Sequence, residues 1–102
     1  MVAHAAFSPL SDGVVRIDGE LTVETVPQLY RDGRRLIEQS TGELRLDLAG
    51  VTRGDSGGLA LMVDWLAEAA RLGKSLRFSN LPDEIQALAG LIEVTPLFSA
   101  EG

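Results

Sequence analysis

The strongest chemical signature in this sequence is the segment 54–58, Gly-Asp-Ser-Gly-Gly, which fits the G-x-S-x-G pattern around a nucleophilic serine. A serine hydroxyl is a weak nucleophile unless a base lies within hydrogen-bond reach and a third group orients that base. The only histidine, His4, lies close to the start of the chain. A chain of 102 residues also has no room for the two barrels of a chymotrypsin-like protease or the large sheet of an α/β-hydrolase. We therefore predict no catalytic residue and a protein that is not an enzyme.

The same segment can also be a turn between a strand and a helix. Ser56 would then cap the helix by accepting a hydrogen bond from the N–H of Gly58 or Leu59. Gly57 and Gly58 would let another backbone approach closely, and Asp55 would help to hold the turn. On this interpretation the segment has a structural or binding role.

Composition limits the classes of partner. Fifteen acidic and nine basic residues give a net charge of -6, the wrong sign for binding nucleic acid. The chain has no cysteine and one histidine, so we expect no metal site, and it has no phosphate-binding lysine loop, so we expect no cofactor. No segment has the ~20 apolar residues of a membrane span or the pattern of a signal peptide. We expect one domain over residues 1–102, in the cytoplasm and not inserted into the membrane.

Periodicity predicts the elements that position the turn. Apolar residues alternate with polar ones over residues 14–18, 44–48 and 75–79, as in strands buried on one face, and residues 5–10 could add an edge strand. Helical spacing covers residues 26–38, 57–72 and a segment from residue 82, with Thr25 and Gln28 as a candidate capping box. This order predicts a small two-layer α/β fold, with a mixed sheet of four to five strands and helices mainly on one face.

The helix expected at 57–72 has an unusual apolar side. Leu61, Trp65 and Leu72 lie between its charged back and its core-facing side. We expect them to form an exposed apolar patch for a partner, although the first or third helix could instead cover them. Gly33, in the middle of the first helix, costs about 1 kcal/mol relative to alanine and has no explanation in the sequence.

Residues 44–61, with the sequence LRLDLAGVTRGDSGGLAL, resemble the signature region of the STAS domain family. Residues 18–22 and 73–78 resemble the family's turn before the first helix and its fourth strand, so the resemblance covers about residues 14–98. It implies a STAS-like α/β domain that acts by binding another protein.

Within the family, the run Asp-Ser-Gly-Gly-Leu-Ala-Leu is similar to the helix start of STAS subunits from phospholipid-transport ABC systems, with Ser56 in place of a threonine. The resemblance implies a cytoplasmic protein that is held at the inner membrane by its partner, the ATPase subunit of the transporter, which it stabilises or regulates. The expected contact residues are Ser56, Gly57 and Gly58, with Leu61 and Trp65 beside them.

The alternative within the same family is an anti-sigma-factor antagonist of a signalling pathway. In antagonists a second hydroxyl residue receives phosphate from a partner kinase, and this chain has Gly57 at that position. Ser56 is the remaining candidate for phosphorylation.

Overall fold

The structure is a computed structural model, which describes residues 2–92 and 95–98. The predicted alternation and helical spacing appear as the following elements: β1 (Ala5–Ser11), β2 (Val14–Leu21), α1 (Val26–Gln39), β3 (Leu44–Gly54), α2 (Ser56–Arg71), β4 (Leu76–Ser79), α3 (Asp83–Leu91) and the short 3-10 helix η1 (Thr95–Phe98).

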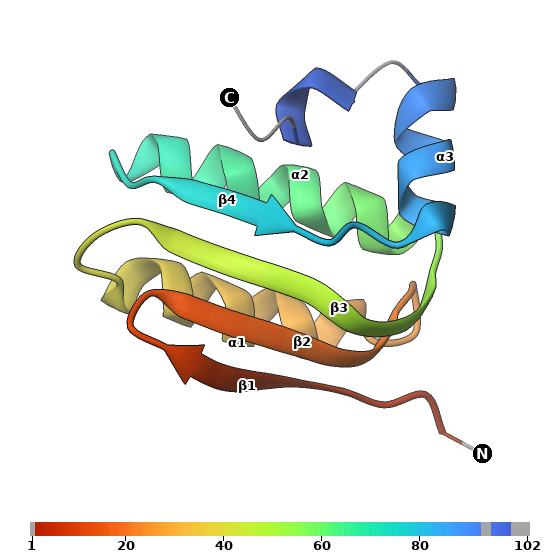
Figure 1. Cartoon of the computed structure of the whole chain (residues 1–102), viewed down its shortest axis with the longest axis horizontal. Helices are drawn as coiled ribbons and strands as arrows, with labels where there is room; N and C mark the ends of the chain where they lie inside the picture. Colours follow the sequence, from red (N-terminus) through yellow and green to blue (C-terminus); the bar gives the residue numbers. More distant parts are fainter. Residues whose placement is uncertain (1, 93–94, 99–102) are drawn as a thin grey trace.

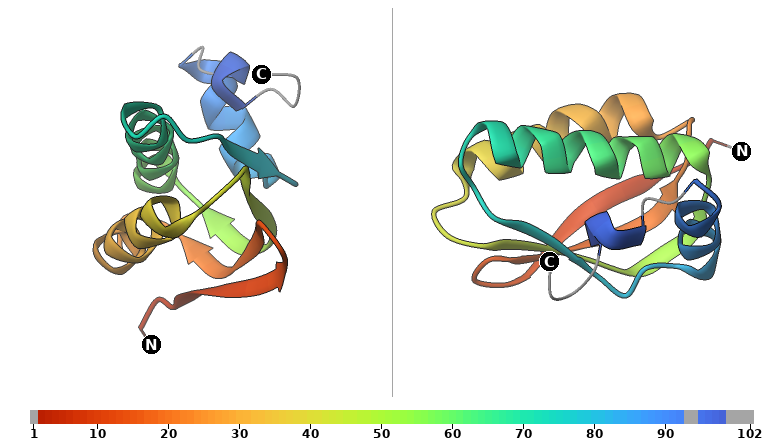
Figure 2. Two further views of the ribbon diagram at one scale, coloured as in Figure 1. Left: turned by 90° about the vertical axis from the view of Figure 1, so that its left-hand side faces the viewer. Right: turned by 90° about the horizontal axis from the view of Figure 1, so that it is seen from above.

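The four strands form one mixed sheet in the order β1-β2-β3-β4. β1 runs antiparallel to β2, whereas β2, β3 and β4 are parallel to one another. Helices α1 and α2 lie side by side on one face of this sheet, and α3 stands near the end where β3 passes into α2 (Figures 1 and 2). The two-layer α/β fold predicted from the sequence is confirmed.

The alternating residues of the strands divide as predicted between a buried and an open face. Those that point toward the helices form the core; in β2 and β3 they are Val15, Ile17, Leu44, Leu46 and Leu48. The charged residues of the same stretches, Arg16, Asp18, Arg45 and Asp47, lie on the other face and at least partly in solvent. Because each buried aliphatic side chain contributes roughly 1.5–3 kcal/mol relative to an exposed one, this division fixes which face the helices cover.

The structure corrects the expected exposed patch on α2. Trp65 is 0% exposed and Leu61 is 4% exposed, since α1 packs along this side of α2. The indole of Trp65 lies against Gly33 of α1, where an added Cβ would be 2.3–2.4 Å from three atoms of the ring. Phe7 of β1 packs on the same indole with ring centroids 6.0 Å apart. The glycine inside α1 therefore has a packing function, which is to admit the tryptophan.

The expected capping box at the start of α1 is also wrong. Thr25 precedes the helix, but its hydroxyl donates to the carbonyl of Glu20 at 2.8 Å and makes no cap hydrogen bond. Gln28 instead reaches β1, where its Nε2 donates to the carbonyl of Ala5 at 3.2 Å. Both side chains thus attach α1 to the sheet.

An ion-pair cluster joins the outer sides of α1 and α2. The buried carboxylate of Glu68 on α2 pairs with Arg34 of α1 at 3.2 Å and with Arg71 at 2.7 Å. The hydrogen bonds from Arg71 and the charge of Arg34 hold the pKa of the Glu68 carboxyl below its ordinary value, although burial acts in the opposite direction. Arg34 also stacks over the ring of Tyr30, 4.7 Å from its centroid.

The contact between Gly33 and Trp65 predicts an unusual effect of alanine. Gly33→Ala should destabilise the domain by about 1–3 kcal/mol, because the new methyl group overpacks the indole and outweighs the gain in helix propensity. In a Trp65→Phe background the same change should cost clearly less, since the smaller ring makes room. Urea unfolding measures both. The control is Gly42→Ala, where the added Cβ meets nothing within 4 Å; a loss at Gly42 equal to that at Gly33 would contradict the contact.

The ion pairs of Glu68 predict a dependence of stability on pH. A carboxyl whose pKa is lowered by folding stabilises the native state above its ordinary pKa of about 4.3, and this contribution disappears as the pH falls through the native pKa. The difference in free energy of unfolding between wild type and Glu68→Gln should therefore be constant from about pH 7 to pH 5 and should shrink below about pH 4. Urea titrations at each pH provide the measurement, with Glu24→Gln, at an exposed residue, as the charge-matched control. A difference that persists at low pH would contradict this role of the charge.

Candidate functional site

Asp55 fastens the turn at the end of β3 to the loop after β2. It is the N-cap of α2, with an extended backbone, and its Oδ1 accepts the N–H of Gly58 at 3.0 Å. Its Oδ2 accepts the N–H of Val23 at 3.1 Å, and its own N–H donates to the carbonyl of Leu21 at 3.2 Å. The residue expected to support the turn thus bonds two segments that are far apart in the sequence.

The two glycines of the motif allow this close approach. An added Cβ on Gly58 would lie 2.1 Å from the carbonyl oxygen of Leu21, and one on Gly57 would lie 2.9 Å from the Cα of Val23. The backbone that approaches them is therefore the chain's own β2–α1 loop. Gly58 is buried by this contact, whereas Gly57 remains partly exposed.

Ser56 is the first residue of α2 and is exposed. The prediction that Ser56 caps the helix is wrong, because Asp55 already accepts the N–H that Ser56 would have accepted. In the described part of the chain the Ser56 hydroxyl makes no hydrogen bond, and because the residue is exposed the hydroxyl is an available donor and acceptor.

Exposed small and apolar residues surround this hydroxyl. Val23 is 65% exposed and lies against Gly57, and Ala60 is exposed one helical turn after Ser56, on the same side of α2. We call Val23, Ser56, Gly57 and Ala60 the tip. Of the five predicted contact residues, Ser56 and Gly57 belong to it; Gly58, Leu61 and Trp65 lie beneath the surface.

Val23 and Ala60 were not predicted as contact residues from the sequence. Val23 follows Leu21 and Thr22 at the end of a strand, and nothing in its neighbours along the chain indicates that it meets Gly57. Ala60 follows Ser56 by four residues. Once the start of the helix is known, this spacing indicates that the two residues lie on the same side of it.

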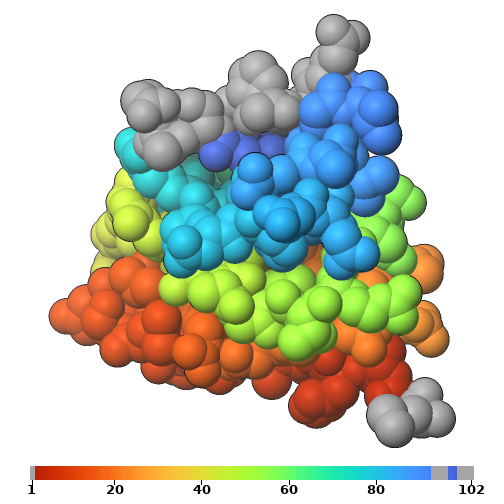
Figure 3. Space-filling model, turned by 45° about the vertical axis from the view of Figure 1, so that its right-hand side comes forward, coloured from red at the N-terminus to blue at the C-terminus, as the bar shows by residue number. Residues whose placement is uncertain are grey.

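Helix α3 supports the turn from its other flank. The Glu84 carboxylate accepts the N–H of Gly54 at 3.0 Å, and the Ile85 side chain occupies the space beside Gly54, where an added Cβ would meet it at 2.7 Å. In Figure 3 the surface of α3, in blue, adjoins the green surface of β3 and of the start of α2. Two flanking segments, the β2–α1 loop and α3, therefore hold the tip in a fixed position.

Among the four residues of the tip, Ser56 alone has a polar side chain, so its hydroxyl is the one side-chain group there that could react or form a hydrogen bond. His4 lies just before β1, where its carbonyl accepts the N–H of Glu20 at 2.9 Å, and it is exposed and makes no hydrogen bond to Ser56. Residues 2–92 and 95–98 contain no group of three or more His, Cys, Asp or Glu side chains that could hold a metal ion. Within the same ranges no helix has the length and apolar character needed to cross a membrane.

Comparison with known proteins identifies a family. The family model described as "Mlab, STAS domain" matches residues 5–97, which is nearly the whole chain. No curated protein sequence matches the chain.

Solved structures show the same fold. The anti-sigma factor antagonist SpoIIAA, in its unphosphorylated form, is 16% identical, with a TM-score of 0.64 over 86% of this chain and 83% of that chain. A putative anti-sigma factor antagonist from Thermotoga maritima is 16% identical, with a TM-score of 0.74 over 93% and 83% of the two chains. The murine anion transporter Slc26a9 is 13% identical with a TM-score of 0.57, and the match covers 86% of this chain but 14% of that chain.

The geometry of the turn predicts that substitution of Asp55 lowers the stability of the domain, whereas substitution of its neighbour Ser56 hardly changes it. Asp55→Ala should lower the free energy of unfolding by about 0.5–2 kcal/mol, because it removes the helix cap and the bond to Val23. Asp55→Asn keeps one acceptor oxygen and should lose less, whereas Ser56→Ala should change stability by less than about 0.5 kcal/mol. Thermal and urea unfolding of the three variants test this. A loss in Ser56→Ala that equals the loss in Asp55→Ala would show that Ser56 is the cap.

Proposed function

The chain belongs to the STAS domain family, and from this premise we propose that it is the STAS subunit of a phospholipid-transport ABC complex of the Mla type. In this role it docks on the ATPase subunit of the transporter, which it stabilises or regulates, and it catalyses no reaction itself. The partner holds it at the cytoplasmic side of the inner membrane. The family model supports this proposal, since it carries the name Mlab.

The observation that carries the proposal is the tip. Ser56 is exposed, and its neighbours at the tip, Val23, Gly57 and Ala60, are small, so a partner helix or loop can come close to the backbone of α2. Asp55 and Glu84 fix this surface before any partner arrives, which lowers the entropy lost on binding. Leu61 and Trp65 act from below, as the core that holds α2 in place.

The residue after Ser56 favours constitutive docking over a phosphorylation cycle. Gly57 carries no oxygen to phosphorylate, and the contact with Val23 leaves no space for a side chain there. A phosphate on Ser56 would suit the positive end of the helix but would place about -1.5 to -2 charges on the tip, where it would weaken docking.

The second candidate is an anti-sigma-factor antagonist. The similar folds of SpoIIAA and of the Thermotoga protein support it, and so does the exposure of Ser56. It requires Ser56 to take the phosphate in place of the missing second hydroxyl. The neighbouring genes separate the two candidates at low cost, since transporter genes favour the first and genes for a sigma factor and its kinase favour the second.

Substitutions at the tip should reduce docking without unfolding the domain. Val23→Asp and Ser56→Glu should each weaken binding to the Mla-type ATPase subunit of the same organism by roughly tenfold or more, equal to about 1.4 kcal/mol, because both place charge on the contact surface. Leu10→Asp is the matched control, since Leu10 is an exposed apolar residue at the end of β1. Biolayer interferometry gives the affinities, and thermal melts verify the fold of each variant.

Unchanged affinity in both tip variants, while the folded wild type binds the ATPase, would show that docking uses another surface. The transporter assignment itself would be contradicted by stoichiometric phosphate on Ser56 in cells, found by phosphopeptide mapping, together with binding to an anti-sigma kinase and none to the ATPase; this result would select the antagonist.

A further inference from the structure

Two β-bulges in β3 decide which of its residues lies opposite the end of β2. From Val14 to Leu21 β2 advances seven residues, while β3 advances nine over the same ladder, from Arg45 to Gly54. Each of the two extra residues makes a β-bulge, which leaves one residue without a partner in the ladder and bends the strand. Without the bulges Thr52 would lie opposite Leu21, and the turn that carries the tip would begin about 7 Å further along.

The first bulge is held by the side chain of Asp47. It consists of Leu48 and Ala49, which together lie opposite the single residue Ile17 of β2. The Oδ1 atom of Asp47 accepts the N–H of Ala49 at 2.9 Å. A carboxylate that accepts an amide of the bulge stabilises it, because that hydrogen bond is charge-assisted. Asp47 therefore stabilises the conformation that sets the register of β3 on its way to the tip.

The same oxygen atom of Asp47 also holds the residue that follows β4. The Nδ2 of Asn80 donates to this oxygen at 2.9 Å. Asn80 has a φ of 56°, and within residues 2–92 and 95–98 it is the one non-glycine residue with a positive φ. Asparagine tolerates this left-handed backbone better than most residues, because its side chain can form a local hydrogen bond. The hydrogen bonds from Asn80 and then from Ala49 hold the pKa of the Asp47 carboxyl below its ordinary value, so the acceptor is ionised at neutral pH.

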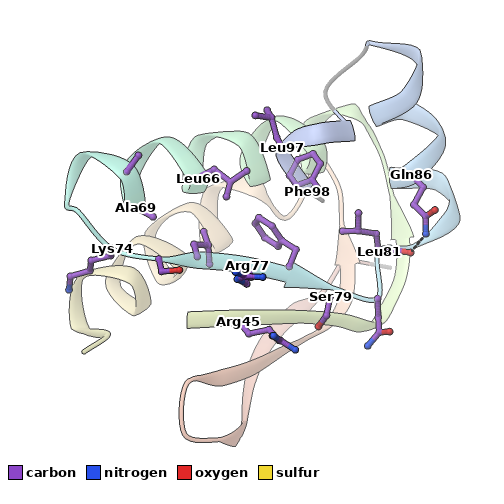
Figure 4. A pocket seen from close by; sticks show the side chains of 15 residues that line it. Arg45, Leu66, Ala69, Lys74, Arg77, Ser79, Leu81, Gln86, Leu97 and Phe98 are labelled. Carbon is purple, nitrogen blue, oxygen red and sulfur yellow. Dashed lines mark hydrogen bonds between the residues drawn. The ribbon is translucent and has the colours of Figure 1, made fainter. Parts of the chain in front are cut away.

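The segment after β4 continues into the helix that supports the tip. Pro82 is the N-cap of α3, with φ fixed near its observed -61° by the ring. The Nε2 of Gln86 donates to the carbonyl of Leu81 at 2.9 Å, a bond that Figure 4 shows as a dashed line. Glu84, in the first turn of α3, accepts the N–H of Gly54 at 3.0 Å. The position of Glu84 thus depends on the direction in which the chain leaves β4.

Two series of contacts therefore connect Asp47 with Gly54. Along β3, the bulge sets the register of Gly54 against β2. Across the sheet, the bond to Asn80 fixes the residue from which the chain turns into α3, and Glu84 of that helix holds the N–H of Gly54. Asp55, which fastens the tip, is the next residue along the chain.

We propose that Asp47 is a positioning residue for docking, which acts on the tip from a distance through Ala49 and Asn80. Asp47 lies seven residues before Gly54, about 20 Å along the strand, and among the described residues no hydrogen bond joins it to the tip. The effect on docking rests on the proposed function, whereas the effect on the tip itself requires no partner. A change at Asp47 alters the tip in a domain that is still folded.

Hydrogen exchange of single amides, measured by NMR on the whole chain, tests the positioning directly. In Asp47→Ala, exchange at Gly54 and Gly58 should accelerate roughly tenfold more than at Met62, a buried residue of α2, because the opening is local. The amide of Ala49 should accelerate as well, since it loses its acceptor. Asp47→Asn keeps an acceptor oxygen and should restore most of the protection at all of these amides.

Asn80→Gly separates the two series of contacts. Glycine adopts a positive φ freely but offers no donor to Asp47, so Gly54 should exchange faster while Ala49 keeps its protection. Glu38→Ala, which removes an acidic side chain from an exposed residue of α1, is the control and should leave these rates unchanged. If Asp47→Ala fails to fold by circular dichroism, Asn80→Gly and Asp47→Asn replace it.

Affinity for the ATPase subunit is the second measurement. Asp47→Ala should weaken binding by roughly threefold to tenfold at a temperature where the variant is folded, and Asp47→Asn should recover most of it. Equal acceleration at Gly54 and Met62 would overturn the proposal, because Asp47 would then stabilise the whole domain. Unchanged exchange at Gly54, or unchanged affinity in a variant whose Gly54 exchanges faster, would overturn it too. A wild type that does not bind the ATPase would contradict the proposed function, and the exchange rates would still decide whether Asp47 positions the tip.

Discussion

The first turn of α2 lies so close to the end of β2 that residue 58 can only be glycine, since a Cβ there would be 2.1 Å from the carbonyl oxygen of Leu21. This approach brings together the loop after β2 and the turn after β3, which meet because the two strands are parallel and end at the same edge of the sheet. Asp55 then bonds both segments. The tip results from this constraint: its residues come from two loops that neither strand could position alone.

The burial of Trp65 follows from the place of α2 in the helix layer. Helical periodicity separates one apolar side from one polar side and so describes a helix that packs on a sheet alone. α2 packs on the sheet and also along α1, so a second side is buried, and that side holds Leu61 and Trp65. The mid-helix glycine of α1 was the signal for this contact in the sequence, because a costly Gly33 implies a large neighbour that needs the space.

The parts predicted from the sequence were those that depend on local patterning. Alternation over residues 14–18 and 44–48 sufficed for the strands, and the mixed sheet followed from the order of the elements. The prediction of Ser56 as the cap was wrong, and Asp55 is the cap, since both residue types cap helices well and the outcome depends on β3 extending to Gly54. Val23 reaches the tip from a segment that is remote in sequence, so no local pattern could reveal its contact with Gly57.

Helix α3 supports the tip from the side that the β2–α1 loop does not reach. Its Glu84 carboxylate accepts the N–H of Gly54, while Gln86, two residues later, donates to the carbonyl of Leu81 after β4. The helix thus links the end of β3 to the segment after β4, and these two strands are parallel neighbours in the sheet. The position of the tip therefore depends on contacts from three segments that are far apart in the sequence: the β2–α1 loop, the turn after β3 and α3.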